Sequence, residues 1–258
     1  QLHALKKAVD HRWFALFMEQ GTGKSWVCLA AASKFFHDGE IEALVVLAPK
    51  GVYLNWKEQL ELHWPDQVAY DVFEWSSYKV QSVLQNLRAG VNLVPLKQSR
   101  KSFKILLMNI EALSSKARVP TRGIGRVDPT RSAVDYLDTF MITHRSMLVV
   151  DESTTIKSHK SSRSKHLLNV RQKAVKRWIM TGTPITKSPV DLFGQCLFLE
   201  RGIIPYTSLI AFENQFCIKR PVILGPRRFN KIEGYKNLDE LKGLVEPFSF
   251  RVLKSECL

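Results

Sequence analysis

A glycine-rich stretch near the start of the chain, Glu-Gln-Gly-Thr-Gly-Lys-Ser, has the residue types that bind a nucleotide phosphate. Gly21 and Gly23 would let the backbone wrap closely around an anion, and the first amides of a following helix would point at it. Lys24 would add positive charge, and the hydroxyl of Ser25 could bind Mg²⁺. The full signature has one more glycine, where this chain has Met18. The intact half predicts a site for the phosphates of ATP, and the alternative is a glycine turn before an ordinary helix.

Two adjacent carboxylates, Asp151 and Glu152, follow a second apolar run. An acid pair that leaves a buried strand is costly unless a cation lies nearby, and Mg²⁺ bound to ATP is such a cation. Asp151 is suited to binding Mg²⁺, and Glu152 to orienting and deprotonating the water that attacks the γ-phosphate. The alternative is a strand end capped by acids that have no catalytic role.

A third polar segment, Thr181-Gly182-Thr183, lies where a later apolar run ends. Its two hydroxyls flank a glycine at the point where the backbone must leave a sheet. They could sense the γ-phosphate beside the acid pair and link it to a neighbouring domain or to DNA. A plain turn would use the same residues.

The elements that must position these segments alternate between short β-rich runs and helical stretches, which indicates a parallel sheet with crossover helices. Ligands bind at the carboxyl ends of such strands, where all three segments lie. We therefore expect a three-layer α/β fold with a mostly parallel central sheet. The expected strands cover residues 13–18, 43–48, 68–73, 104–109, 147–150 and 178–181. The expected helices cover residues 24–36, 52–63, 78–87, 133–140, 164–175 and 190–199, and residues 115–130 are expected to form an exposed loop.

Composition points to a polyanionic partner. The chain has 258 residues, enough for one substantial core, and a formal net charge of +14. The charge is uneven, because residues 157–177 contain eight Lys or Arg and no acid. The alternative is a surface that only keeps the protein soluble. No apolar run of about 18 residues is present, so we expect no membrane attachment.

Cysteine usage favours a reduced, cytoplasmic protein. The four cysteines are scattered without the CxxC spacing of a zinc site or redox centre. No signal peptide is visible, and the chain opens on Gln1 rather than on methionine, so an upstream segment could have been removed.

The order of these segments and their amino-acid sequences resemble those of the superfamily-two helicase motors, and within them the first RecA-like lobe of the Swi/Snf-related ATPases. Residues 19–25 resemble motif I, residues 45–50 with 55–58 motif Ia, residues 151–157 motif II, and residues 181–185 motif III. The Trp seven residues after Pro49, Trp56, is more discriminating than the phosphate loop, which unrelated NTPases share. Asp-Glu-Ser-Thr in place of Asp-Glu-Ala-His looks most like the phage and bacterial branch.

The resemblance implies a RecA-like P-loop NTPase domain and a role for each matching residue. Lys24 and Glu152 would be catalytic, and Ser25 and Asp151 would hold Mg²⁺. Trp56 is expected to pack its helix onto the sheet, and the alternative is that it stacks on a base of the DNA. The residues that would bind the nucleotide are Gln1, which would contact adenine, Gly21, Thr22, Gly23, Lys24 and Ser25. The residues that would couple ATP to DNA are Thr181, Gly182 and Thr183, and those that would contact the DNA backbone are Lys50, Asn109, Lys157 and Lys160.

Motors of this family need a second RecA-like lobe that supplies an arginine finger, and nothing in this chain resembles it. We therefore expect residues 1–240 to form lobe one and residues 241–258 to begin the connection to a second lobe. The implied function is the ATP-binding lobe of a duplex-DNA translocase, in the cytoplasm of a bacterial or phage-infected cell. The isolated lobe should bind ATP and hydrolyse it very slowly, because an arginine finger contributes about 10³- to 10⁵-fold in comparable NTPases.

Two other function classes stay open. A non-motor P-loop enzyme such as a kinase would need an acceptor pocket and a lid, and the sequence shows no arginines placed for one. A DNA-binding or scaffold module that has lost catalysis would fit the high charge. Degenerate ATPases of this kind usually lose the lysine or the acid pair, whereas Lys24, Asp151 and Glu152 are all present.

Overall fold

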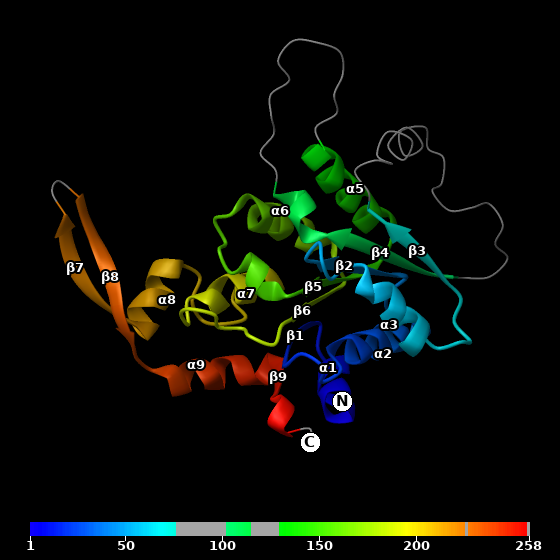
Figure 1. Ribbon diagram of the computed structural model, residues 1–258, viewed down its shortest axis with the longest axis horizontal. Helices are drawn as coiled ribbons and strands as arrows, with labels where there is room; N and C mark the ends of the chain where they lie inside the picture. Colours follow the sequence, from blue (N-terminus) through cyan, green and yellow to red (C-terminus); the bar gives the residue numbers. More distant parts are fainter. Residues whose placement is uncertain (76–101, 115–128, 225–226, 257–258) are drawn as a thin grey trace, which may run out of the picture.

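A seven-stranded parallel sheet forms the centre of the computed structural model, which describes residues 1–75, 102–114, 129–224 and 227–256 (Figure 1). The strands lie in the order β3-β4-β2-β5-β6-β1-β9, and every neighbouring pair is parallel. The expected α/β fold with a mostly parallel central sheet is confirmed. The strand bounds are β1 Trp13–Met18, β2 Ala43–Ala48, β3 Tyr70–Glu74, β4 Phe103–Asn109, β5 Ser146–Asp151, β6 Lys176–Met180 and β9 Ser249–Val252.

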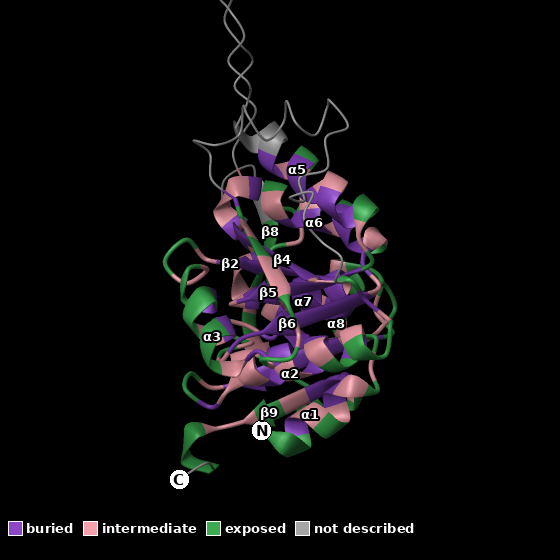
Figure 2. Cartoon of the chain, turned by 90° about the vertical axis from the view of Figure 1, so that its right-hand side faces the viewer, coloured by how far each residue is buried: buried purple, intermediate pink, exposed green. Residues whose placement is uncertain are grey.

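Both faces of this sheet are covered, which is why its central strands are continuous apolar runs rather than alternating ones. Alternate residues of β2 belong to two different apolar clusters: Val45 and Leu47 pack on one face, and Leu44 and Val46 on the other. The strands seen from the side in Figure 2 are mostly buried between the helices. The sheet is therefore the middle layer of three.

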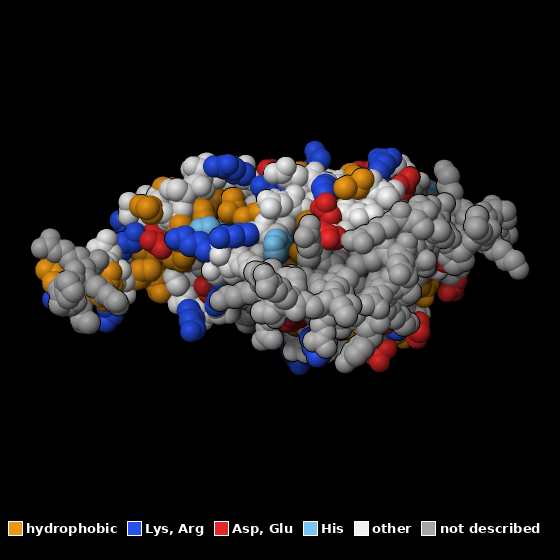
Figure 3. All heavy atoms as spheres, turned by 90° about the horizontal axis from the view of Figure 1, so that it is seen from above, with side chains coloured by type: hydrophobic (Ala, Val, Ile, Leu, Met, Phe, Trp, Pro, Cys, Tyr) orange, Lys and Arg blue, Asp and Glu red, His pale blue; other side chains and the backbone are white. Residues whose placement is uncertain are grey.

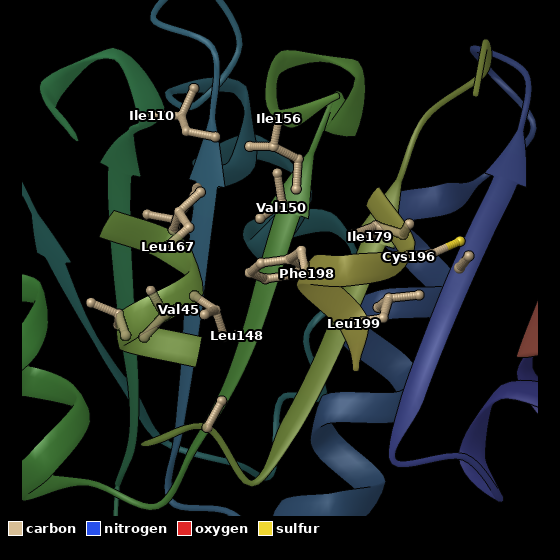
Figure 4. Packing of buried hydrophobic residues seen from close by; sticks show 14 of the residues in the cluster. Val45, Ile110, Leu148, Val150, Ile156, Leu167, Ile179, Cys196, Phe198 and Leu199 are labelled. Atoms are coloured by element: carbon tan, nitrogen blue, oxygen red, sulfur yellow. The ribbon is translucent and has the colours of Figure 1, made fainter. Parts of the chain in front are cut away.

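Helices from the first and the second half of the sequence cover different faces of the sheet. One face is covered by α1 Leu2–Val9, α2 Lys24–His37 and α3 Asn55–His63. The other is covered by α5 Pro129–Thr143, α6 Ser162–Val170 and α7 Asp191–Leu199, with α8 Leu209–Phe216 and α9 Leu238–Val245 packed beside them (Figure 1). In Figure 4, Val45, Leu148 and Ile179 of the strands lie against Leu167 of α6 and Phe198 of α7.

Several predicted bounds are wrong by a few residues. The strand expected at 68–73 begins at Tyr70, and the one expected at 178–181 covers Lys176–Met180, so Thr181 lies just beyond it. The helix expected from residue 52 begins at Asn55, because the carbonyl of Pro49 first accepts the N–H groups of two turn residues. The helix expected to reach residue 175 ends at Val170, where a 3₁₀ turn follows. The helix expected at 78–87 lies outside the described residues, as do residues 115–128 of the loop expected at 115–130. The last two residues of that expected loop begin α5 instead.

Other elements were not expected from the sequence. They are α1, α8, α9, the edge strand β9, and an antiparallel hairpin of β7 Cys217–Leu224 and β8 Arg227–Tyr235 that projects at the left of Figure 1. β9 pairs with β1, so part of the segment 241–258 lies in the central sheet. The domain division at residue 240 stays a prediction. Within the described part of the chain, no helix has the length and apolar character needed to cross a membrane.

Gly194 lies where α7 meets the segment after β5. A Cβ atom there would lie 2.3 Å from the carbonyl oxygen of Lys157 and 2.8 Å from that of Ile156. Both are backbone atoms, so a larger residue would push α7 away from the segment that follows β5.

We expect Gly194→Ala to lower the free energy of unfolding by about 1–3 kcal/mol, because overpacking forces backbone shifts. Urea denaturation followed by circular dichroism measures this change. The matched control is Gly243→Ala on α9, where an added Cβ meets nothing within 4 Å. Its better helix propensity predicts a gain of up to about 1 kcal/mol. Equal effects of the two substitutions would show that α7 does not pack this closely.

Candidate nucleotide-binding site

The strand order brings the three polar segments to one edge of the sheet. The glycine-rich loop follows β1, the acid pair ends β5, and Thr181 follows β6. Because β6 lies between β5 and β1, the threonine segment lies between the other two. All three leave the carboxyl ends of parallel strands, as the α/β pattern predicts.

The loop between β1 and α2 has the backbone that its glycines allow. Gly21 has a φ of +85° and Gly23 a φ of +95°, and both values lie in the left-handed region that favours glycine. Thr22 is buried, and its hydroxyl donates to the carbonyl of Glu19 at 2.7 Å, which closes the turn. α2 begins at Lys24, so its first N–H groups face the loop. This is a backbone arrangement that binds anions.

Lys24 folds back over the loop. Its Nζ donates to the carbonyl of Met18 at 2.9 Å and to that of Glu19 at 3.2 Å. Gln1 reaches the same loop, since its Nε2 donates to the carbonyl of Thr22 at 3.4 Å and lies 2.3 Å from where a Cβ on Gly23 would be. Side chains from α2 and from the residue before α1 therefore meet at the loop.

Asp151 is a buried carboxylate, 6% exposed, at the end of β5. Its Oδ2 accepts the indole N–H of Trp56 at 3.0 Å, and its Oδ1 accepts the backbone N–H of Glu152 at 2.9 Å. Burial raises the pKa of Asp151 above its ordinary value, while the hydrogen bond from Trp56 acts against this rise. The positive charge of Lys24 also acts to lower the pKa of Asp151. Lys24 begins the helix after β1 and Asp151 ends β5, with only β6 between these two strands, so both residues lie at the same edge of the sheet.

Glu152 connects the acid pair to the threonine segment. It is one of two non-glycine residues with positive φ in the described part of the chain, at +48°, and such strain is often found at functional sites. Its Oε2 accepts the hydroxyl of Thr181 at 3.1 Å, and that hydroxyl oxygen accepts the N–H of Thr183 at 3.1 Å. The general-base candidate is therefore held by the segment that was expected to couple to DNA.

Gly182 brings the threonine segment against the phosphate loop. A Cβ atom on it would lie 3.2 Å from Cα of Glu19 and 3.4 Å from the carbonyl oxygen of Met18. These are backbone atoms at the start of the loop. Any larger residue at position 182 would press on the loop directly.

Two of the four DNA-contact candidates lie at neighbouring strand ends. Asn109 ends β4 and pairs in register with Ala48 at the end of β2. Lys50 follows β2, is exposed, and its backbone N–H donates to Oε2 of Glu111 at 3.0 Å. Both residues therefore lie on the same edge of the sheet as the nucleotide loop.

The other two candidates follow the acid pair. Lys160 is exposed. Lys157 is engaged within the chain, since its Nζ donates to the hydroxyl of Thr186 at 2.6 Å and lies 3.6 Å from Oδ2 of Asp191. Figure 3, which views the molecule of Figure 1 from above, shows several Lys and Arg side chains mixed with hydrophobic ones on the half nearer the β7–β8 hairpin. DNA contact by all four residues stays a prediction.

Comparison with known proteins decides the family. A family model described as the SNF2-related domain matches residues 11–257. The chain belongs to the SNF2-related domain family. The resemblance seen in the sequence motifs is thereby confirmed.

Relatives of this SNF2-related domain are longer proteins. It is similar to the DNA annealing helicase and endonuclease ZRANB3 of Mus musculus, with 28% identity over 242 residues, 93% of this chain and 19% of the relative. It is also similar to the putative protein p41 of Acyrthosiphon pisum secondary endosymbiont phage 1, with 28% identity over 193 residues, 70% of this chain and 34% of that protein. The chain thus spans about a fifth of the mouse relative and a third of the phage one.

Solved structures share the fold. The SWI2/SNF2 ATPase core domain of Sulfolobus solfataricus superposes with a TM-score of 0.61 at 20% identity, over 99% of this chain and 44% of that one. The same core in complex with dsDNA gives a TM-score of 0.59 at 19% identity, over 97% of this chain and 43% of that one. These likenesses establish the RecA-like architecture of the SNF2-related domain.

Gln195 is a residue of the site that the sequence analysis missed. It is fully buried on α7, and its Oε1 accepts the hydroxyl of Ser153 at 2.6 Å. Its Nε2 donates to the carbonyls of Pro184 at 2.7 Å and Asp191 at 2.9 Å. Gln195 therefore joins the segment after the acid pair to the segment after Thr183. The sequence offers one indication of this role, because Gln195 is the one amide side chain within the largely apolar sequence of α7.

We expect Gln195→Leu to lower the free energy of unfolding of the SNF2-related domain by about 1–3 kcal/mol, since it leaves the buried hydroxyl of Ser153 and the half-buried carbonyl of Pro184 without this partner. The control is Gln215→Leu, because Gln215 makes an exposed hydrogen bond with Glu240 and should change stability little. Urea denaturation of both variants measures the difference. A Gln195 variant no less stable than the Gln215 variant would contradict the buried bridge.

Proposed function

We propose that this chain is the ATP-binding lobe of a DNA-dependent ATPase that couples ATP hydrolysis to movement on duplex DNA. One observation carries the proposal: in a member of the SNF2-related domain family, the threonine segment joins the acid pair to the phosphate loop. Thr181 donates to Glu152, and Gly182 lies against the backbone of Met18 and Glu19, whose carbonyls accept from Lys24. A phosphate chain held by the loop would end beside the acid pair.

The nucleotide is assigned to the loop and its flanks. Backbone amides of Gly21, Thr22 and Gly23 and the side chain of Lys24 would bind the phosphates, and Gln1 would contact adenine. The position of the Gln1 side chain beside Gly23 supports this assignment.

Mg²⁺ fits the donors beside the loop. Asp151 is a buried carboxylate whose pKa burial raises, so its ionised form is favoured by a cation close by. Ser25 and Asp151 would hold the ion, since hydroxyl and carboxylate oxygens are ligands that Mg²⁺ prefers. Bound Mg²⁺ would neutralise charge on the β- and γ-phosphates.

Glu152 is the proposed general base. It would orient the attacking water and accept its proton. The hydroxyl of Thr181 fixes the carboxylate by donating to Oε2, and Thr183 fixes that hydroxyl in turn. Because Gly182 also lies against the loop, loss of the γ-phosphate would move Thr181 and Thr183 together with the loop. These residues would thereby couple ATP hydrolysis to DNA.

DNA as the partner is supported by charge and by relatives. The net charge is +14, and a solved neighbour is described as an ATPase core in complex with dsDNA. Lys50, Asn109 and Lys160 would contact phosphates of the DNA backbone, which gives affinity without sequence choice. Lys157 would do so only by exchanging Asp191 for a DNA phosphate.

The remaining parts of the proposal concern the longer protein. A second RecA-like lobe would complete the site with an arginine finger, and DNA would bind across both lobes. Similarity to a phage protein supports a motor that works in the cytoplasm of a bacterial or phage-infected cell.

We expect Glu152→Gln in the full-length protein to lower the DNA-stimulated turnover of ATP at least about 100-fold, because general-base catalysis is worth about 10²- to 10⁴-fold. ATP affinity should stay unchanged, since the amide oxygen can still accept from Thr181. A phosphate-release assay with duplex DNA measures turnover. Glu61→Gln, at an exposed position of α3, is the control. Turnover retained by Glu152→Gln would remove Glu152 from the mechanism.

We expect Gly182→Ala to weaken ATP binding about tenfold or more, because an added methyl would press on the phosphate loop and small misplacements in a site are costly. Binding of a fluorescent ATP analogue measures the effect. Gly51→Ala is the control, since a Cβ there meets nothing within 4 Å. Wild-type affinity in Gly182→Ala would show that the two loops do not touch.

A further inference from the structure

The hydrogen bond from Trp56 to Asp151 joins two elements that are far apart in the sequence. Trp56 lies in the first turn of α3 and is 2% exposed, and its Nε1 is 3.0 Å from Oδ2 of Asp151 at the end of β5. A tryptophan is expected at this position both from the motif and from apolar packing, but neither requires its indole N–H to donate to the carboxylate of Asp151.

The carboxylate of Asp151 is held at both oxygens. The backbone N–H of Glu152 donates to Oδ1 and comes from the adjacent residue, so it places one oxygen only. A carboxylate with one donor can still turn about its Cβ–Cγ bond. The indole N–H on Oδ2 is the second donor, and together the two donors fix the plane of the group.

A second tryptophan shows that packing alone does not demand such a partner. Trp178 on β6 is fully buried in the same apolar cluster as Trp56. Its Nε1 has no hydrogen-bond partner among the described residues. This core therefore accommodates a tryptophan without a partner, and the meeting of Trp56 with Asp151 is a specific contact.

We propose that Trp56 is a positioning residue, whose indole N–H orients the Asp151 carboxylate for Mg²⁺. The inference rests on the proposed function, in which Asp151 holds the ion. Groups that hydrogen-bond to metal ligands orient them, and their loss typically costs about 10- to 100-fold in metal affinity or activity. Trp56 would thus act through Asp151 and without touching the nucleotide.

The test compares Trp56→Phe with Trp178→Phe in the full-length protein. Each change removes an indole N–H from the same apolar cluster, but only the first removes a hydrogen bond. The readout is the affinity for a fluorescent ATP analogue during titration with Mg²⁺, and again in EDTA. We expect Trp56→Phe to need about 10- to 100-fold more Mg²⁺ for half-maximal enhancement of binding, with affinity in EDTA unchanged. Trp178→Phe should match the wild type in both.

A second replacement separates the N–H from the packing of the ring. At position 56, 3-benzothienylalanine keeps the bicyclic shape of tryptophan and has sulfur in place of the N–H. It should show the same loss of Mg²⁺ sensitivity as Trp56→Phe. If the smaller phenylalanine ring impairs folding, the benzothienyl replacement still tests the N–H alone, because it keeps the packing of the bicyclic ring.

Asp151→Asn distinguishes the two ways in which the inference can fail. If Asp151→Asn loses the response to Mg²⁺ while both Trp56 replacements behave like Trp178→Phe, the positioning role is overturned and the proposed function stands. If Asp151→Asn keeps the wild-type response, the metal role of Asp151 fails, and the positioning role of Trp56 fails with it.

Discussion

Burial of the Asp151 carboxylate at the end of β5 is the constraint on which the rest of the site depends. Burial raises its pKa, so donors and positive charge around it favour the ionised form. Those groups come from three separate places: the indole of Trp56 on α3, the backbone of Glu152, and Lys24 on α2. Each is placed by a different strand of one parallel sheet. The surroundings of this one carboxylate thus depend on how three strands of the sheet are aligned.

Strand order does the rest of the assembly. β6 lies between β5 and β1, so the segment after it can touch both of its neighbours. Thr181 donates to Glu152 on one side, and Gly182 lies against the phosphate loop on the other. Below the surface, Gln195 joins Ser153, which follows the acid pair, to Pro184, which follows the threonine segment. The loop, the acid pair and the threonine segment are therefore joined by direct contacts, as the proposed coupling of ATP hydrolysis to DNA requires.

The sequence predicted what is local and missed what depends on distant partners. β1 and β2 were predicted to the residue, because continuous apolar runs end there at polar or proline residues. β9 was missed because it is four residues long and includes the exposed Arg251. The loop and the acid pair were found by residue type and spacing. The hydrogen bonds of Trp56 and Gln195, and the pairing of Lys157 with Asp191, follow from strand order and helix placement, which no local pattern encodes.

A crystal structure of the full-length protein with Mg²⁺ and a non-hydrolysable ATP analogue is the most direct test of the shared site. We predict that the backbone amides of residues 21–25 bind the β-phosphate, and that the ion lies between the phosphates and the carboxylate of Asp151. Nucleotide bound at another edge of the sheet, or an ion held away from Asp151, would contradict the proposal that Lys24 and Asp151 form one ATP site.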